Sequence, residues 1–413
     1  MMLLAVLVAL FVSAAAELPQ EPPLFSWDSV PVFMHSYVQN LSSPNRSGTA
    51  QYIARFSIVT MAGFAGSGGC CATDPSCCNE GRVTEFARAI KSAKGGNGTR
   101  VLYYQNTLIN FPQTRLSNTV PESLLLHDKH GRLVYLGGCG STHAAPNHTI
   151  YDHSLPAMRA AWADNVLQVV QDNKGLVDGV FCDRSGPITA VGVKDLGCYE
   201  FEEGRLRRWD EGHWQAVADT QAALSQFPTA IVIGNHASPQ KSMHLHAPNS
   251  SWDAKMYEHW TPVKVQGMDY VPDGNQLAAF KHDGPNFIDE VHVDHCRVGS
   301  NGTGSLSDMY RSSLAAFLIG ASEYSYYGCT NGWGFSDGWE LWSDDYDRPL
   351  GPPLGPANRT ATGWRRKFQS GTEVWLDIKD QTASHWGSSC IRWADGHVTQ
   401  SGKLCRKGGP KNE

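Results

Sequence analysis

Short apolar runs alternate with amphipathic segments along most of the chain, and this alternation limits the possible folds more than any other feature of the sequence. Each run has the length of a buried strand. Alternating strands and helices predict a parallel sheet, and eight such strands over about 300 residues predict a closed (β/α)8 barrel, the TIM-barrel architecture. The predicted strands are 31–37, 56–63, 100–106, 176–183, 230–236, 253–259, 287–294 and 317–327.

Helices are predicted between these strands because apolar residues recur at helical spacing, as at Leu155, Met158, Trp162 and Val166. The alternative is a doubly wound open sheet, but no glycine-rich dinucleotide motif follows the first strand. Segment 107–154, rich in Pro, Gly and His, is predicted to be an elaborated loop after the third strand. The predicted helices are 81–94, 155–172, 203–226, 274–282 and 306–320.

The first sixteen residues combine an apolar run with a closing Ala-Ala-Ala, which is typical of a cleaved secretory signal peptide. A buried N-terminal helix is the alternative. Glycosylation sequons agree with secretion, because such sites lie in surface loops of secreted or lumenal proteins. They occur at Asn40, Asn45, Asn97, Asn147, Asn249, Asn301 and Asn358. The chain is therefore expected to be extracellular, with no transmembrane segment after the leader.

Eleven cysteines in an oxidising compartment should mostly form disulfides. The cluster CCATDPSCC at 70–78 favours disulfides over a zinc site for the same reason. Cys390 and Cys405 bracket one hairpin-sized segment and are predicted to pair. An odd count leaves one thiol over, and Cys182, on the strand face opposite Asp183, is predicted to be buried and unreactive.

Composition changes after Tyr346, where segment 347–360 becomes rich in Pro and Gly. Residues 361–405 then alternate apolar and polar side chains around turns, which predicts a small antiparallel β module. The predicted organisation is a signal peptide at 1–16, a barrel at 17–346, a linker at 347–360 and the β module at 361–405. A net charge of −6 without a basic run argues against a nucleic-acid partner.

Polar residues follow or end nearly every predicted strand, whereas the strand bodies are mostly apolar. In a barrel, the carboxyl ends of the strands form the active site. Each polar residue alone has a structural explanation, but their joint occurrence favours a site. The candidate substrate-binding residues are His35, Tyr104, Asn106, Arg184, Asn235, His236, Tyr257, Asp294 and Glu323.

Two of the strand ends carry carboxylates suited to glycoside hydrolysis, Asp183 and Glu258. Val177, Gly179, Phe181 and Asp183 share one strand face, so Asp183 is predicted to point into the barrel mouth, whereas Asp178 near the strand start is predicted to be structural. The orientation of the sixth strand stays open, because Lys255 lies on the face opposite Glu258.

The two carboxylates receive different predicted roles. Arg184 would favour the ionised form of Asp183, as a nucleophile or base requires. Tyr257 and Trp260 would favour the protonated form of Glu258, as a general acid requires. Asp294 and Glu323 are alternative members of the pair.

The pieces GVFCDRSG, KMYEHW and RPLGPPLGPANRTATGWRRKFQSGTEVWLDI resemble glycoside hydrolase-like TIM-barrel proteins. These proteins carry an acidic residue after strand four, another after strand six, and a C-terminal β segment with the pattern W-x-R-x-F-x-x-G. A more distant resemblance is to endo-α-1,4-polygalactosaminidase barrels. The resemblance implies a sugar-cleaving role for Asp183 and Glu258 on a carbohydrate substrate.

Two other functions compete with this interpretation. A non-catalytic carbohydrate-binding or cell-surface barrel is the first, because a fold alone does not determine function. A metal-dependent hydrolase is the second, but the first strand carries a single His35 and the spacing of His292 and His295 suits neither a helix nor one strand face. No metal and no other cofactor is therefore predicted.

Overall fold

The computed structural model describes most of the chain between residues 19 and 405. The described residues are 19–37, 49–62, 71, 73–74, 76, 78–139, 148–188, 196–236, 254–260, 288–298, 304–331, 342–380 and 386–405. The predicted signal peptide and the predicted helix 274–282 lie outside these residues.

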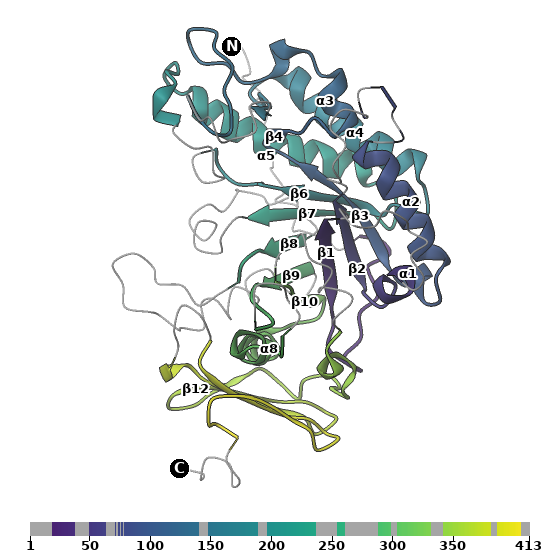
Figure 1. Cartoon of the computed structure of the whole chain (residues 1–413), viewed down its shortest axis with the longest axis vertical. Helices are drawn as coiled ribbons and strands as arrows, with labels where there is room; N and C mark the ends of the chain where they lie inside the picture. The colour runs from purple at the N-terminus through teal and green to yellow at the C-terminus, as the bar shows by residue number, and fades with distance from the viewer. Residues whose placement is uncertain are drawn as a thin grey trace, which may run out of the picture.

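Eight parallel strands form one sheet in the order β1-β2-β3-β6-β7-β8-β9-β10 (Figure 1). A parallel bridge between Val32 and Tyr327 brings its two edges together, so the sheet is a nearly closed barrel. The predicted (β/α)8 fold class is confirmed. The strands are β1 Phe33–Tyr37, β2 Ile58–Ala62, β3 Arg100–Asn106, β6 Gly179–Asp183, β7 Ile231–His236, β8 Ala254–Tyr257, β9 Ile288–Val293 and β10 Ser325–Cys329.

Helices lie on the outside of the barrel in the connections β1–β2, β2–β3, β3–β6, β6–β7 and β9–β10 (Figure 1). Met158, Trp162, Val166 and Val169 of α4 are buried against it, as their spacing predicts. The helices are α1 Thr49–Ile53, α2 Asn79–Ser92, α3 Arg115–Thr119, α4 Pro156–Asp172, α5 Arg205–Leu224 and α8 Asp308–Gly320. Single helical turns occur at Gly96–Gly98, Glu122–Leu124, Leu196–Cys198, Asp344–Asp347 and Ile378–Asp380. No helix among the described residues has the length and apolar character needed to cross a bilayer.

Side chains alternate between the barrel interior and the layer under the helices. The interior cluster is Phe33, Ile58, Leu102, Tyr104, Phe181, Ile231, Ile233, Ala254, Met256, Ile288 and Tyr326. Ala254 and Met256 both belong to it, which settles the orientation of β8. Asp183, two residues after Phe181, and Glu258, two residues after Met256, therefore both lie on the inward face at the barrel mouth.

The eighth predicted strand is misplaced. Residues 317–320 of the predicted strand 317–327 belong to α8, and β10 begins only at Ser325. The apolar run FLIG was assigned to a strand because α8 is buried almost all round, so its sequence lacks the polar face of an ordinary amphipathic helix. As a consequence, Glu323 precedes β10 and lies at the opposite end of the barrel from Asp183.

The segment after β3 forms a small substructure of its own. A two-stranded antiparallel pair, β4 Ile109–Asn110 and β5 Thr149–Ile150, packs with Leu126, Val134 and Trp209 in a separate apolar cluster. The disulfide Cys139–Cys198 ties it to the segment that follows β6. The sequence predicted this region only as an elaborated loop.

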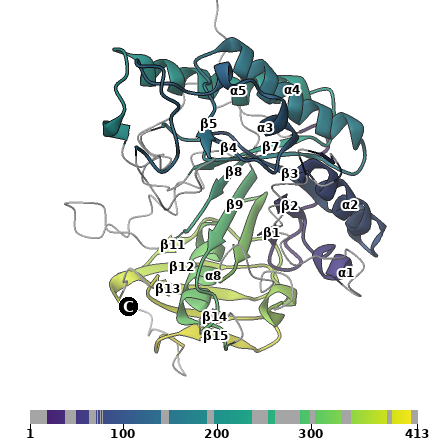
Figure 2. The same cartoon turned by 45° about the horizontal axis from the view of Figure 1, so that its top comes forward.

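A second, antiparallel sheet closes the chain and lies against α8 on the side away from the barrel (Figure 2). Its inner face buries Val374, Leu376 and Ile391. Its strands are β11 Asn358–Arg359, β12 Gly363–Lys367, β13 Glu373–Asp377, β14 Ser388–Arg392 and β15 Val398–Ser401. The domain boundaries given above stay predictions, and β11 begins before the predicted module start at 361.

Four disulfides form among the described cysteines, and Cys390–Cys405 is among them as predicted. The others are Cys71–Cys78, Cys139–Cys198 and Cys296–Cys329. Cys182 is a buried free thiol, and burial raises its pKa above the ordinary range, so it is unreactive as predicted.

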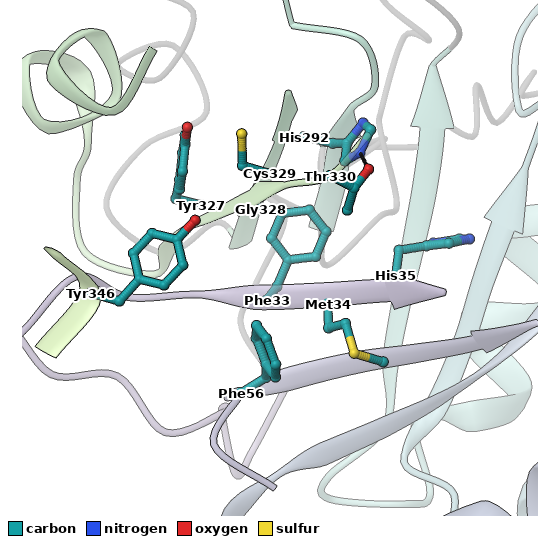
Figure 3. Close-up of a pocket in the computed structure, with 10 residues that line it drawn as sticks. All are labelled: Phe33, Met34, His35, Phe56, His292, Tyr327, Gly328, Cys329, Thr330 and Tyr346. Atoms are coloured by element: carbon teal, nitrogen blue, oxygen red, sulfur yellow. Dashed lines mark hydrogen bonds between the residues drawn. The ribbon is translucent and has the colours of Figure 1, made fainter. Parts of the chain in front are cut away.

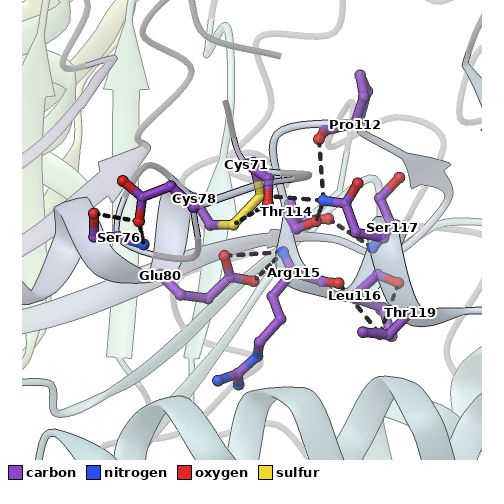
Figure 4. The surroundings of a disulfide bond; sticks show 12 residues. Cys71, Ser76, Cys78, Glu80, Pro112, Thr114, Arg115, Leu116, Ser117 and Thr119 are labelled. Carbon is purple, nitrogen blue, oxygen red and sulfur yellow. Dashed lines mark hydrogen bonds between the residues drawn. A yellow bond between two sulfur atoms is a disulfide. The ribbon is translucent and has the colours of Figure 1, made fainter. Parts of the chain in front are cut away.

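The Cys71–Cys78 disulfide lies beside the start of α2 (Figure 4). There the Glu80 carboxylate accepts two hydrogen bonds of 3.1 Å from the backbone N–H of Arg115. Cys70 and Cys77 of the same cluster lie outside the described residues.

Arg366 on β12 connects the C-terminal sheet to the end of α8. The side chain is buried, and its Nη1 donates to the backbone oxygens of Ala321 at 2.6 Å, Leu318 at 3.1 Å and Ile319 at 3.3 Å. The last carbonyls of a helix lack partners within the helix, and a cation there interacts favourably with the helix dipole. Burial lowers the pKa of Arg366 to about 10, so the side chain remains charged at neutral pH.

We expect Arg366→Met to lower the free energy of unfolding by about 2–4 kcal/mol, because it leaves buried carbonyls without donors. The matched control is Arg365→Met. Arg365 lies on the opposite sheet face in a partly exposed ion pair of 3.1 Å with Glu373, which contributes at most about 1 kcal/mol. Urea denaturation of both variants measures the difference. Equal losses would contradict the anchoring role of Arg366.

Candidate active site

Polar side chains from neighbouring strands converge at the carboxyl ends of the barrel strands. Their positions follow from strand geometry, because every second residue of a strand points to the same face. Counting by twos from the interior residues along each strand gives an inward-facing series of side chains. The inward series ends at His35 on β1, Asn106 on β3, Asp183 on β6, Asn235 on β7, Glu258 after β8 and His292 on β9.

Asp183 accepts hydrogen bonds from four donors. Oδ1 accepts from the backbone N–H of Arg184 and from Asn235 Nδ2, both at 2.8 Å. Oδ2 accepts from the Tyr104 hydroxyl and from Asn106 Nδ2 at 2.9 Å. A carboxylate is an acceptor-only group, so four converging donors suit its ionised form. Arg184 therefore supports Asp183 through its backbone N–H.

Asn235 links the two candidate carboxylates. Its Nδ2 donates to Asp183 Oδ1 and to Glu258 Oε2, each at 2.8 Å. The two carboxylate oxygens are therefore no farther apart than 5.6 Å, the sum of the two contacts. Asn235 is buried, and its position on β7 between β6 and β8 explains why one amide can reach both groups.

Glu258 lies in polar surroundings, contrary to the prediction of apolar company. Tyr257 and Trp260 belong to the cluster between the barrel and its outer layer, where Trp260 packs against Trp386 in a tilted arrangement with ring centroids 4.1 Å apart. Tyr257 thus lies outside the barrel interior and not at the mouth, where the sequence predicted it. The neighbour of the Glu258 carboxylate is His259, whose Nε2 lies 3.3 Å from Oε1.

His259 also connects Glu258 with Asp294, because its Nδ1 donates to Asp294 Oδ2. This hydrogen bond, together with the negative charge of Glu258, raises the pKa of His259 above its ordinary value. Burial works to raise the pKa of Asp294, but the hydrogen bond from His259 and the nearby imidazoles lower it overall. Asp294 lies at the barrel mouth, where the sequence predicts it, and is hydrogen-bonded there to His259.

Three residues directly after strand-end carboxylates adopt left-handed backbone conformations. The φ angles are 57° at Arg184, 53° at His259 and 60° at His295. Such angles are uncommon for residues other than glycine and often occur at functional sites. The turn at each strand end explains why strand alternation alone does not predict where these three side chains point.

His35 packs against two aromatic side chains. Its ring centroid lies 4.5 Å from that of Phe181 and 5.9 Å from that of Tyr104, the residue that donates to Asp183. Burial lowers its pKa to about 4, against the opposing charge of Asp183, so the imidazole is neutral at neutral pH. A small cavity between β1 and β10 reaches from here to the hydrogen-bonded pair His292 and Thr330 (Figure 3).

Two further residues were predicted to lie in the site, Glu323 and His236. Glu323 precedes β10 at the far end of the barrel, so its predicted place in the site is wrong. His236 ends β7, but its side chain lies outside the described part of the chain. At the opposite end of strand β6, Asp178 contacts Lys91 Nζ at 2.8 Å and the backbone N–H of Val101 at 2.9 Å, which agrees with its predicted structural role.

His259, His292 and Thr330 are the site residues that the sequence did not predict. His292 shares an inward series with Ile288 and Glu290, and this alternation was the available signal. One ligand atom from each of His259, His292 and Asp294 lies within 4.8 Å of the others, so these groups could hold a metal ion. The sequence suggested His295 as the partner of His292, whereas the structure places His292 beside His259, in the turn after β8.

Residues 98–372, about two thirds of the chain, match the model of hypothetical glycosyl hydrolase family 15. The chain belongs to this family. This member of the glycosyl hydrolases carries both Asp183 and Glu258 within the matched residues. A search of curated proteins finds no match.

Solved structures similar to this family member include glycosidases of low sequence identity. α-L-Fucosidase isoenzyme 2 from Paenibacillus thiaminolyticus is 15% identical with a TM-score of 0.46, over 76% of this chain and 48% of the fucosidase. This chain thus spans about half of the fucosidase. The α-amylase from Geobacillus thermoleovorans is 10% identical with a TM-score of 0.47, over 92% of this chain and 97% of the amylase. At these values neither comparison identifies the substrate.

Proposed function

We propose that this protein hydrolyses a glycosidic bond in an oligo- or polysaccharide with Asp183 as nucleophile and Glu258 as general acid and base. The observation that carries the proposal is the Asn235 amide, which holds Asp183 Oδ1 and Glu258 Oε2 no more than 5.6 Å apart at the mouth of the barrel. Family membership supports glycosyl hydrolysis, and the site supplies the pair of carboxyl groups that this chemistry uses.

The separation of the carboxylates favours a retaining mechanism. Retaining enzymes hold the two groups ~5 Å apart, whereas inverting enzymes need ~6.5–9.5 Å to admit a water molecule. In the first step, Asp183 attacks the anomeric carbon while Glu258 gives its proton to the departing glycosidic oxygen. In the second step, Glu258 removes a proton from water, and the water oxygen replaces Asp183 at the anomeric carbon.

The four donors around Asp183 explain the assignment of roles. They stabilise a carboxylate that must stay ionised before attack, and they hold it in one orientation. Glu258 accepts one hydrogen bond from Asn235 and lies beside His259, a group that can take part in proton exchange. Tyr104, Asn106 and the neutral His35 line the same mouth and are proposed to contact sugar hydroxyls.

The mechanism predicts the configuration of the first product. On incubation with a panel of oligosaccharides and aryl glycosides, we expect new reducing ends with the anomeric configuration of the substrate. Proton NMR at early times, before mutarotation, distinguishes the two anomers. Release of the opposite anomer would contradict the retaining assignment. Saturable glycan binding without any cleavage would instead support the non-catalytic barrel.

We also propose that the protein is secreted and N-glycosylated. The support comes from the N-terminal apolar segment, four disulfides, and sequons whose Asn97 and Asn358 side chains are exposed. Protein from the native secretory source should therefore move faster on a denaturing gel after treatment with an N-glycosidase. Unchanged mobility, with a glycoprotein standard digested in parallel, would contradict the proposal.

A further inference from the structure

We propose that His259, His292 and Asp294 form a binding site for a divalent transition-metal ion of the Zn²⁺ class. One nitrogen or oxygen atom from each residue lies within 4.8 Å of the other two. Two imidazoles and one carboxylate are ligands that zinc commonly uses, with metal–ligand distances of about 2.0–2.2 Å. Small side-chain rotations would bring three atoms at this separation onto one ion.

The backbone around the three residues is held in place. The backbone N–H of Trp260 donates to the His292 carbonyl at 2.8 Å, which connects the turn that carries His259 to β9. Strands β8 and β9 also pair directly, with Tyr257 opposite Val291. A site assembled on paired strands keeps its ligands in place before the ion arrives, which lowers the entropic cost of binding.

The His292 imidazole is oriented by a further residue. Thr330 Oγ1 lies 2.9 Å from His292 Nε2, and His292 is buried. Histidines that bind metals commonly have a hydrogen-bonding partner on one ring nitrogen, which determines the ring orientation. Asp294 and His259 are less buried, so an ion could reach the site from the barrel mouth.

The ligand set favours a transition metal over Ca²⁺ or Mg²⁺. Those hard cations take six or more oxygen ligands in most proteins, whereas this cluster offers two nitrogen donors and one carboxylate. In its ionised form, the Glu258 carboxylate next to His259 would add a second negative charge near the proposed ion. The positive charge of a divalent ion would therefore be balanced locally.

A bound ion would lie close to Glu258 and attract its carboxylate. On the proposed function, this would hinder proton donation, so Zn²⁺ would inhibit hydrolysis. This consequence rests on the proposed function, but the metal site itself does not. The decisive measurement is therefore the binding of the metal alone.

Isothermal titration of the untagged full chain with ZnCl₂ tests the site. The matched variants are His259→Asn and His295→Asn. Both histidines are exposed and have left-handed φ angles of 53° and 60°, a conformation that Asn tolerates, but only His259 belongs to the cluster. Asp294→Asn gives a second ligand removal with nearly unchanged shape.

We expect the wild type to bind one equivalent of Zn²⁺. The affinity for this ion should fall by about tenfold or more, or binding should disappear, in His259→Asn and Asp294→Asn, and the affinity should be unchanged in His295→Asn. Circular dichroism of each variant confirms that it is folded. Absence of saturable binding in the wild type, or equal affinity in all three variants, would overturn the proposal.

Discussion

Asp183→Asn should reduce kcat by about a thousandfold or more while leaving the protein folded, because an amide cannot attack the anomeric carbon as a carboxylate does. The side-chain shape is unchanged. The new NH₂ group can point toward the Tyr104 hydroxyl, although it also meets the Asn106 donor, so we expect a stability loss of only about 1–2 kcal/mol. Initial rates on a cleaved glycan and thermal denaturation measure the two effects.

Asp178→Asn is the matched control, since Asp178 lies at the other end of the same strand. Its carboxylate contacts Lys91 Nζ at 2.8 Å and is buried. Removing one partner of a buried ion pair costs about 3–5 kcal/mol. This variant should therefore lose stability and keep its kcat below its melting temperature. If Asp183→Asn retained full activity, or if it unfolded while Asp178→Asn did not, Asp183 would be structural rather than catalytic.

Glu258→Gln should slow hydrolysis of ordinary glycosides by about 10²–10⁴-fold, because no group remains to protonate the leaving oxygen. Aryl glycosides with acidic phenol leaving groups need little protonation, so their first step should be much less affected. Sodium azide should then restore turnover by attacking the glycosyl-enzyme intermediate, giving a glycosyl azide of retained configuration. Steady-state kinetics and NMR of the azide product measure these effects.

Glu323→Gln is the control for charge removal, because Glu323 is exposed and lies before β10 at the far end of the barrel. It should leave the kinetics unchanged. Equal behaviour of the two Glu→Gln variants on every substrate would contradict the role of Glu258. Azide products of inverted configuration would contradict the covalent intermediate but not the participation of Glu258.

The barrel fold, and the side of the strand to which Asp183 points, could be predicted because both depend on patterns that are local in the sequence. Period-two alternation through Gly179, Phe181 and Asp183 placed the candidate nucleophile inward, and the structure agrees. The same reasoning separated Asp183 from Asp178. The bridging position of Asn235 between two carboxylates was not predictable, because it depends on the spatial order of β6, β7 and β8 and on side-chain rotamers.

The wrong predictions of side-chain position arise where strand alternation ends, or where an apolar run has the composition of a strand but forms a helix. The residues after the two candidate catalytic carboxylates, Arg184 and His259, have left-handed backbones, so strand alternation no longer applies there. Tyr257 was predicted to bind substrate from its position in the sequence beside Glu258, but neighbours along a strand face opposite sides. Glu323 was misplaced because the buried helix α8 has the uniform apolar composition of a strand.

The position of α8 has a consequence for how the chain folds during its synthesis. The helix is buried almost completely, with the barrel on one side and the C-terminal sheet on the other (Figure 1). The open edge of β1 meets β10, where the Tyr327 N–H donates to Pro31 at 2.9 Å, about 300 residues later in the chain. The edge of β1 therefore stays unpaired until β10 has been synthesised, and one face of α8 stays uncovered until β15 has been synthesised. A growing chain thus exposes an unpaired strand edge and apolar surface until almost the whole sequence has left the ribosome.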